Sequence, residues 1–228
     1  MSRFISEIKK SYDDNISVAI LGNETDYRVR SYGPKCLLKY GSSTIIQNQI
    51  KLIGETSCIS DLVVVLGFEC EKIINYIPDH VRVVENQLYY ETNSSESLRL
   101  IINNICGDRL LIIDGNILIS RKAFKKLDFS NSFALCHKND KLKNEISASK
   151  IGDHIGNFSF GLENCWDGIA FLQGKEFGLL RKACADREKG KFFVFELLNL
   201  VIDTGGKIEV QECKAGDVKV INSIKDIA

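Results

Sequence analysis

The chain contains 228 residues, of which 44% are hydrophobic, and this length and composition suit one large domain better than two. Its 30 lysines and arginines balance 30 aspartates and glutamates, so no net field draws the chain to nucleic acid or to an anionic membrane. It shows no apolar run as long as a transmembrane helix and no signal-peptide pattern at its start. We therefore expect one cytoplasmic domain over residues 1–228, with residues 1–15 as an N-terminal extension.

The eight cysteines are spread along the chain without a C-x-x-C pair, and there are only three histidines. This spacing is not that of a zinc site, and no Cys/His arrangement indicates a nucleophile. Most of the cysteines lie in apolar runs and are expected to be small core residues. Free thiols fit the reducing cytoplasm.

Short apolar runs alternate with segments of helical periodicity. In chain order, strands are predicted at 17–21, 62–66, 81–84, 110–113, 133–135, 168–171 and 207–210. Helices are predicted at 45–53, 69–76, 95–105, 175–187 and 193–204. The charged and polar stretch 138–150 is expected to be an exposed loop or flap.

This alternation predicts an α/β fold, with a Rossmann-like, mixed and mainly parallel sheet, helices on both faces and antiparallel strands added late in the chain. We expect the carboxyl ends of 17–21 and 110–113 to open side by side onto one cleft, as adjacent strands do at a switch point. The chain contains neither G-x-x-x-x-G-K nor G-x-G-x-x-G, so it has no P-loop and no dinucleotide fingerprint.

The segment from Ile20 to Ile50 reads ILGNETDYRVRSYGPKCLLKYGSSTIIQNQI. A strand runs into a polar loop, then into Pro34 and Lys35, and then into a helix. This order resembles the opening of nucleotidyltransferases with a Rossmann-like, GT-A-type fold, in which L-A-A-G-x-G-[ST]-R precedes P-K-x-L and a helix. Within that group the chain is similar to sugar-phosphate nucleotidylyltransferases and especially to their phosphocholine-cytidylyltransferase-like relatives.

The resemblance continues in order along nearly the whole chain. DLVVVLGFECEKI is similar to the family's strand followed by G-[YF]-x-x-E-x-I, and VENQLYYETNSSESLRLI to its N-P-x-Y-x-x-T-N-x-x-x-S-L segment. LLIIDGNILIS stands where the family has its G-D metal strand. WDGIAFL resembles the acceptor-pocket strand, FELLNLVIDTGGKIEV the late helix and strand, and VINSIKDIA the closing [DN]-[TS]-P-E-D-L.

The resemblance implies transfer of a nucleoside monophosphate from an NTP of the CTP or UTP class, with Mg²⁺ as cofactor. The acceptor would be a small phosphorylated compound, such as a sugar phosphate or a phosphocholine-like alcohol phosphate. Such a reaction depends on alignment and charge neutralisation. On this resemblance Arg28 holds the β- and γ-phosphates and Lys35 stabilises charge near the α-phosphate. The resemblance also assigns nucleotide binding to Leu21, Gly22, Asn93, Ser95 and Ser97, acceptor binding to Trp166, Asp167 and Glu196, and metal binding to Asp114, Asn116 and Asn222.

Two features depart from the family's pattern. Glu24 and Asp26 occupy loop positions where the family has glycines, and a carboxylate about 4 Å from a phosphate costs roughly 4 kcal/mol before screening. Asn116 stands at the position of the metal aspartate and is a weaker ligand for a hard cation. Asp114 points to the same side of an ideal strand and is expected to take over that role.

The residues leave three functions open. The first is the Mg²⁺-dependent nucleotidyltransferase. The second is a catalytically degenerate descendant that serves as a binding or assembly module, which the acidic loop favours. The third is a glycosyltransferase that holds a sugar nucleotide through a metal at residues 114–116, although Lys35 beside Arg28 favours the first function over it. The less favoured interpretation of Lys35 is a solvated lysine after a turn proline. For Trp166, packing and stacking on the acceptor fit the sequence equally well.

The acidic loop yields a test that separates these readings. If Glu24 and Asp26 repel phosphate, the double variant Glu24→Gly/Asp26→Gly binds CTP or another NTP more tightly than the native chain, because two negative charges are removed. Each 1.4 kcal/mol of removed repulsion is about tenfold in affinity, which a calorimetric titration detects. Weaker Mg²⁺-dependent binding would mean that the two acids hold a metal, and unchanged binding would place the loop outside the cleft.

Overall fold

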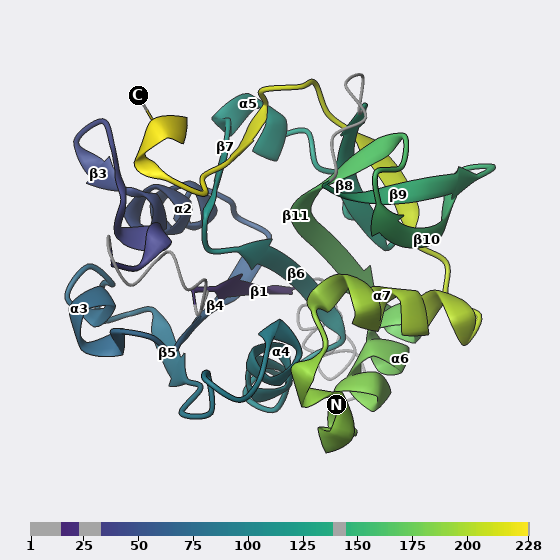
Figure 1. Cartoon of the computed structure of the whole chain (residues 1–228), viewed down its shortest axis with the longest axis horizontal. Helices are drawn as coiled ribbons and strands as arrows, with labels where there is room; N and C mark the ends of the chain where they lie inside the picture. Colours follow the sequence, from purple (N-terminus) through teal and green to yellow (C-terminus); the bar gives the residue numbers. More distant parts are fainter. Residues whose placement is uncertain (1–14, 23–32, 139–144, 228) are drawn as a thin grey trace, which may run out of the picture.

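A computed structural model describes residues 15–22, 33–138 and 145–227 of the chain. Within these residues a nine-stranded sheet forms the centre of the molecule, in the order β5-β4-β1-β6-β11-β8-β12-β10-β9 (Figure 1). Its strands are β1 (Ile16–Leu21), β4 (Ile59–Leu66), β5 (Arg82–Glu85), β6 (Arg109–Asp114), β8 (Phe133–Lys138), β9 (Ile146–Ile151), β10 (His154–Phe160), β11 (Asn164–Gln173) and β12 (Glu209–Glu212). Two small ladders pair β2 (Lys39–Tyr40) with β3 (Ser43–Thr44) and β7 (Ile117–Ile119) with β13 (Val218–Val220).

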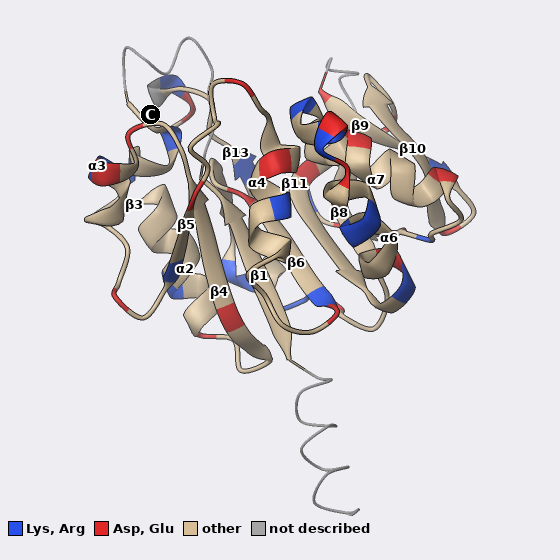
Figure 2. Ribbon diagram, turned by 90° about the horizontal axis from the view of Figure 1, so that it is seen from below, with Lys and Arg blue, Asp and Glu red and all other residues tan. Residues whose placement is uncertain are grey.

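Helices cover both faces of this sheet, as the sequence predicts. The α-helices are α2 (Ile45–Gly54), α3 (Cys70–Ile74), α4 (Ser94–Ile102), α5 (Arg121–Phe124), α6 (Gly174–Ala185) and α7 (Val194–Asp203). Short 3₁₀ helices are η2 (Lys35–Leu37), η3 (Arg187–Lys191) and η4 (Ile224–Asp226). One buried cluster contains side chains of α4, α6 and α7, and the other contains side chains of α2, α3 and α5. Figure 2 shows α4, α6 and α7 in front of the sheet, with basic and acidic residues interspersed over the surface.

The first four strands, β5, β4, β1 and β6, are parallel. All six residues of β1 are buried, with Val18 and Ile20 in the cluster under α2 and Ala19 in the cluster under α4. A strand covered on both faces needs such a continuous apolar run. Leu21 pairs with Asp114 of β6, so the carboxyl ends of β1 and β6 lie side by side, which confirms the predicted neighbourhood of these two strands.

The second half of the sheet is mixed, so the expected mainly parallel order holds for the first half only. β11 runs antiparallel to β6 and β8, while β12 is parallel to β8. β9 and β10 add antiparallel strands, and β9 also pairs with the start of β11. The pairings of β11, β8, β12, β10 and β9 therefore form a ring.

The prediction of an exposed loop at 138–150 is wrong in its second part. β9 begins at Ile146, and its residues Ser147 and Ala148 are buried because they pair with Asn164 and Cys165 of β11. The sequence ISASKI has small and polar side chains and gives little strand signal of its own. Residues 139–144, in the first part of this stretch, lie outside the described residues.

Helix α2 begins at a capping box written in the sequence as T-I-I-Q. The Thr44 hydroxyl accepts a hydrogen bond from the Gln47 backbone N–H (3.3 Å), and the Gln47 side-chain oxygen accepts one from the Thr44 N–H (3.0 Å). Such reciprocal bonds satisfy N–H groups that a helix start otherwise leaves unpaired. The helix then buries Ile46, Ile50 and Ile53 against the sheet. Among the described residues, none of the helices combines the length and apolarity needed to cross a bilayer.

The backbones of β1 and β6 come into contact where both strands end. The Gly115 N–H donates to the Leu21 carbonyl oxygen (3.0 Å), and a Cβ on Gly115 would lie 2.6 Å from that oxygen and 2.9 Å from the Gly22 Cα. These neighbours are backbone atoms and have no rotamer by which to move away. Only glycine fits at this position without separating the two strands.

We expect Gly115→Ala to lower the free energy of unfolding by about 1–3 kcal/mol, because the added methyl overpacks a backbone contact. The matched control is Gly178→Ala in α6, where an added Cβ meets nothing within 4 Å. That substitution should raise the free energy of unfolding by about 0.5–1 kcal/mol, as alanine usually does in a helix interior. Urea denaturation of the two variants measures both effects, and equal values for the two would contradict the close approach.

Candidate functional site

Three segments far apart in the sequence meet at the carboxyl ends of β1 and β6. The Lys35 ammonium donates to the Asn222 side-chain oxygen (3.3 Å), and the Asn116 side-chain amide donates to the same oxygen (3.4 Å). A small hollow beside them is lined by Leu21, Gly22, Pro34, Lys35, Cys36, Gly115 and Asn116. Five residues predicted for the site, namely Leu21, Gly22, Lys35, Asn116 and Asn222, therefore lie together.

Each of these side chains is placed by local structure. Pro34, with φ −60°, precedes the 3₁₀ turn that begins at Lys35. Asn116 lies in the turn between β6 and β7, and its carbonyl accepts from the Ile221 N–H (2.8 Å). Because β13 pairs with β7, the chain returns to this turn and presents Asn222 opposite Asn116.

A buried glutamine, which the sequence analysis did not single out, holds the turn after β6. The Gln49 side-chain amide reaches out of α2 and donates to the carbonyls of Asp114 (2.8 Å) and Ile117 (2.9 Å). Gln49 is buried, and its side-chain oxygen has no hydrogen-bond partner among the described residues. Its signal in the sequence is one polar residue on the otherwise apolar face of a predicted helix.

Asp114 and Asn116 do not act as two residues on one side of an ideal strand, and that part of the prediction is wrong. β6 ends at Asp114, so Asn116 already lies in the turn. The Asp114 carboxylate borders Gly168 of β11, where an added Cβ would lie 2.6 Å from its Oδ2 atom. The Asn116 amide instead contacts Asn222.

The residues placed here do not fit a Mg²⁺ ion. A protein site for Mg²⁺ usually includes one or two carboxylates, whereas Asn116 and Asn222 are neutral. A side-chain carbonyl has two lone pairs, and the Asn222 oxygen already accepts from two donors. Within residues 15–22, 33–138 and 145–227, no cluster of three His, Cys, Asp or Glu side chains is arranged to hold a metal. Arg28, Glu24 and Asp26 lie outside the described residues.

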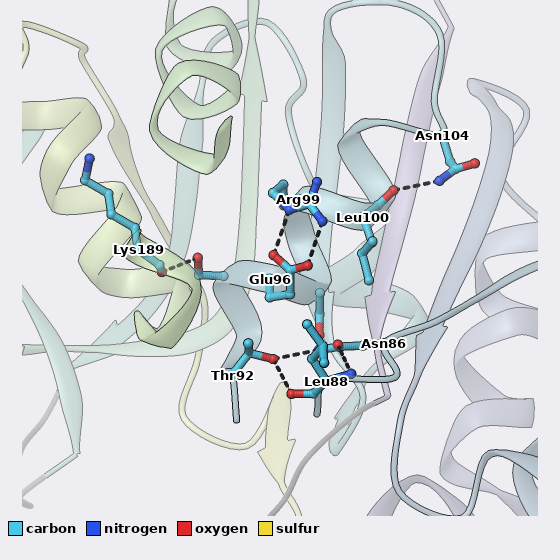
Figure 3. A network of polar contacts seen from close by, with 10 residues as sticks. Asn86, Leu88, Thr92, Glu96, Arg99, Leu100, Asn104 and Lys189 are labelled. Atoms are coloured by element: carbon cyan, nitrogen blue, oxygen red, sulfur yellow. Dashed lines mark hydrogen bonds and ion pairs between the residues drawn. The ribbon is translucent and has the colours of Figure 1, made fainter. Parts of the chain in front are cut away.

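A network of polar contacts surrounds the start of α4, and Figure 3 shows the part of it around Asn86, Thr92, Glu96 and Lys189. The Asn93 side chain donates to the Lys191 carbonyl (2.9 Å), and the Ser95 hydroxyl donates to the Lys189 carbonyl (2.7 Å). Ser97 is fully buried and accepts from the Asn86 side chain (3.1 Å). These bonds hold η3 against the start of α4, and contact of the three residues with a nucleotide stays a prediction.

Two of the predicted acceptor residues, Trp166 and Glu196, form hydrogen bonds with the protein backbone. The Trp166 indole N–H donates to the Ile169 carbonyl (2.9 Å), and its ring packs edge-on against Phe158 with 5.7 Å between centroids. This contact agrees with the packing interpretation of Trp166. The Glu196 carboxylate accepts from the Phe193 N–H (2.8 Å) at the start of α7.

Asp167 is the centre of a cluster that sequence reasoning missed. Its carboxylate, 1% exposed, contacts the His137 ring Nδ1 (2.8 Å) and accepts from the Cys213 thiol (3.2 Å). The three residues come from β8, β11 and the segment after β12, so no spacing along the chain points to them. Burial raises the pKa of the Asp167 carboxyl, although His137 and Cys213 oppose this shift. Burial, together with the Asp167 charge, also raises the pKa of the Cys213 thiol, which therefore stays protonated as a donor.

A larger hollow of about 310 Å³ lies elsewhere, beside α2 and β7. Its lining includes Tyr40, Lys51, Arg121 and Lys219 and contains none of the residues predicted for the site. The smaller hollow is the one lined by residues that the sequence predicts for the site, namely Leu21, Gly22, Lys35 and Asn116.

Several solved structures share this fold. The structure of CTP:phosphocholine cytidylyltransferase from Streptococcus pneumoniae superposes with a TM-score of 0.77 at 20% identity, covering 92% of this chain and 95% of that chain. The inositol-1-phosphate CTP transferase from T. maritima gives a TM-score of 0.72 at 17% identity, covering 94% of this chain and 91% of that chain. A nucleoside-diphosphate-sugar pyrophosphorylase from Vibrio cholerae gives a TM-score of 0.66 at 12% identity, with coverage of 92% and 97%.

The chain has the fold of the nucleotidyltransferases. No family model matches its sequence, and no curated protein matches it in a sequence comparison. The likeness therefore lies in the three-dimensional arrangement, and it agrees with the resemblance found in the sequence motifs.

The raised pKa of Asp167 predicts how stability depends on pH. The folded state holds the Asp167 proton more tightly than the unfolded state, whose ordinary pKa is 3.8. The contribution of Asp167 to stability is therefore greatest below pH 3.8 and declines as the pH rises through the folded-state pKa. We expect Asp167→Asn to gain stability relative to the native chain as the pH is raised above about 4.

The control variant is expected to change stability with pH in the opposite direction. Hydrogen bonds from Ser130 lower the pKa of the exposed Asp128 carboxyl, so its contribution is present above pH 3.8 and is lost as the pH falls through the folded-state pKa. The stability of Asp128→Asn relative to the native chain should therefore increase as the pH falls. Denaturant titrations of both variants between about pH 3 and pH 7 give these differences, and parallel curves for Asp167→Asn and native protein would contradict the assignment.

Proposed function

We propose that the chain transfers a nucleoside monophosphate from an NTP of the CTP or UTP class to a small phosphorylated acceptor, such as a sugar phosphate or a phosphocholine-like alcohol phosphate. One observation carries this proposal. Lys35 lies with Asn116 and Asn222 where β1 and β6 end side by side, in a fold shared with proteins whose names include CTP transfer. In open α/β sheets, ligands bind at such a switch point.

In this reaction an acceptor phosphate oxygen forms a bond to the α-phosphorus, the bond between the α-phosphorus and the bridging oxygen breaks, and pyrophosphate leaves. Lys35 stabilises the negative charge that develops at the α-phosphate. Arg28 holds the β- and γ-phosphates, and the backbone at Leu21 and Gly22 borders the triphosphate. Among Asn93, Ser95 and Ser97, the partly exposed Asn93 borders the base or sugar, and the buried Ser95 and Ser97 position the start of α4. Of the acceptor residues, Trp166 and Glu196 are partly exposed and face the acceptor, and Asp167 acts through the partly exposed His137 ring that it contacts.

Mg²⁺ has a limited role in the proposed reaction. A magnesium ion would supply charge neutralisation at the phosphates. Of the three residues predicted to hold it, Asp114 carries the only carboxylate, which borders Gly168, whereas Asn116 donates to Asn222. The charge-neutralising step is therefore assigned to Lys35 and Arg28.

A second candidate is a binding or assembly module that has kept the fold without the transfer step. The observation that favours it is the neutral pair Asn116 and Asn222, with Asn116 at the position where the resemblance expects an aspartate. The acids Glu24 and Asp26 in the first loop support it as well. The two candidates differ in whether pyrophosphate is released.

We expect Lys35→Met to reduce kcat/KM by about 10²- to 10³-fold, because a cationic group at the transferring phosphate is lost. Pyrophosphate release should be measured with CTP, UTP, ATP and GTP, each combined with sugar 1-phosphates and with phosphocholine. The matched control is Lys39→Met, which removes an exposed lysine of β2 and should leave the rate unchanged. Full activity of Lys35→Met would contradict the proposal, and a native chain that releases no pyrophosphate from any pair would favour the second candidate.

A further inference from the structure

The hydrogen bonds at Asn222 determine which kind of ligand this site accepts. Its side-chain oxygen receives N–H groups from Lys35 (3.3 Å) and Asn116 (3.4 Å). Asn116 is 4% exposed, so its amide is held inside the protein with its NH₂ group toward Asn222. With both lone pairs of the Asn222 oxygen in use, the amide presents its own NH₂ group, and not an oxygen, to a ligand.

The charge of the site agrees with these hydrogen bonds. Lys35 contributes an ammonium that can donate three hydrogen bonds, and Asn116 and Asn222 contribute no charge. Asp226 of the C-terminal segment accepts from the N–H groups of Asn222 (2.9 Å) and Ser223 (2.7 Å) through one carboxylate oxygen. Although burial raises the Asp226 pKa, these hydrogen bonds and the nearby Lys35 charge lower it, so this acid also interacts with the ammonium. Asp114, the acid at the end of β6, has its carboxylate against Gly168 of β11. A divalent cation between the two asparagines would be repelled by the ammonium, whereas an anionic oxygen would meet N–H donors.

We propose that this site binds a phosphate oxygen of a nucleotide directly, without a divalent cation, and that the Lys35 ammonium supplies the positive charge. The inference rests on the proposed function in taking a nucleotide as the ligand. It goes beyond that function because it assigns to Lys35, Asn116 and Asn222 together an anion site in place of a metal site. Asn116 and Asn222 are positioning residues here, since the Asn222 oxygen accepts from the ammonium and the Asn116 amide donates to that same oxygen.

Isothermal titration calorimetry tests this with CTP, UTP and inorganic tripolyphosphate, each in buffer with EDTA and in buffer with MgCl₂. We expect the native chain to bind at least one of these probes in EDTA with an affinity no weaker than in MgCl₂. The variant Asn116→Asp/Asn222→Asp introduces two carboxylates and should bind the same probe at least about tenfold more weakly in EDTA. Added MgCl₂ should restore its binding, because charged oxygen ligands attract the hard cation.

The control variant is Asn103→Asp/Asn131→Asp, which changes the net charge by the same amount at two exposed positions outside the site. Its affinity for the probe should stay within about twofold of the native value in both buffers. Thermal unfolding of each variant reports whether it is folded. If Asn116→Asp/Asn222→Asp does not fold, Asn222→Asp alone, at an exposed position, takes its place with the same expected direction.

Three results would overturn the inference. The first is native binding that disappears in EDTA. If pyrophosphate release then appears with MgCl₂, that result supports the proposed function and contradicts the anion site. The second is binding in EDTA that the two new carboxylates leave unchanged. The third is a native chain that binds none of the three probes in either buffer. Binding that persists in EDTA and is weakened by the carboxylates supports the anion site, whether or not pyrophosphate is released.

Discussion

The contact between the backbones of β1 and β6 is the constraint on which the candidate site depends. The Gly115 N–H reaches the Leu21 carbonyl because glycine leaves room that any Cβ would fill. With the strands this close, the chain leaves β6 directly beside the end of β1. The buried side chain of Gln49 then holds the turn through the carbonyls of Asp114 and Ile117. A buried carbonyl needs a partner, so this one side chain both satisfies the turn and fixes its position.

The rest of the site is attached to this turn by the last part of the chain. β13 pairs with β7, and the Ile221 N–H donates to the Asn116 carbonyl. Asn222 therefore comes to lie opposite Asn116 through backbone hydrogen bonds on both sides. Lys35 arrives independently from the 3₁₀ turn after Pro34. Three segments each contribute one polar side chain, and the geometry of their contact is set by ladders and turns outside the contact itself.

The sequence predicts those parts of the fold that short-range patterns determine. The apolar runs of β1, β4 and β6 and the capping box of α2 are local features, and the structure places these elements where the patterns indicate. β9 was missed because its strand character comes from its pairing with β10 and β11 and not from its own residues. Sheet pairing of this kind depends on the context of the strand more than on propensity.

The residues of the candidate site also fall into two groups, those that local motifs indicate and those that only the fold brings together. Lys35, Asn116 and Asn222 were predicted because motifs in a fixed order mark them. The cluster of His137, Asp167 and Cys213 was not, because strand order brings together residues that lie 30 and 46 positions apart. Gln49 was overlooked for a further reason: a glutamine on an apolar helix face has no meaning until the carbonyls that it meets are known.

A shared fold identifies the open edge of the sheet, but the chemistry there comes from individual side chains. On the proposed function, two neutral amides and an ammonium border the nucleotide, and this arrangement suits both an enzyme and a binding module. At the acceptor side, the carboxylates of Asp167 and Glu196 already accept hydrogen bonds from the protein. The His137 side chain, 24% exposed, is the part of the Asp167 cluster that extends toward solvent. On the proposed function, an acceptor on this side would therefore contact that imidazole or displace one of these hydrogen bonds, which adds a free-energy cost to binding.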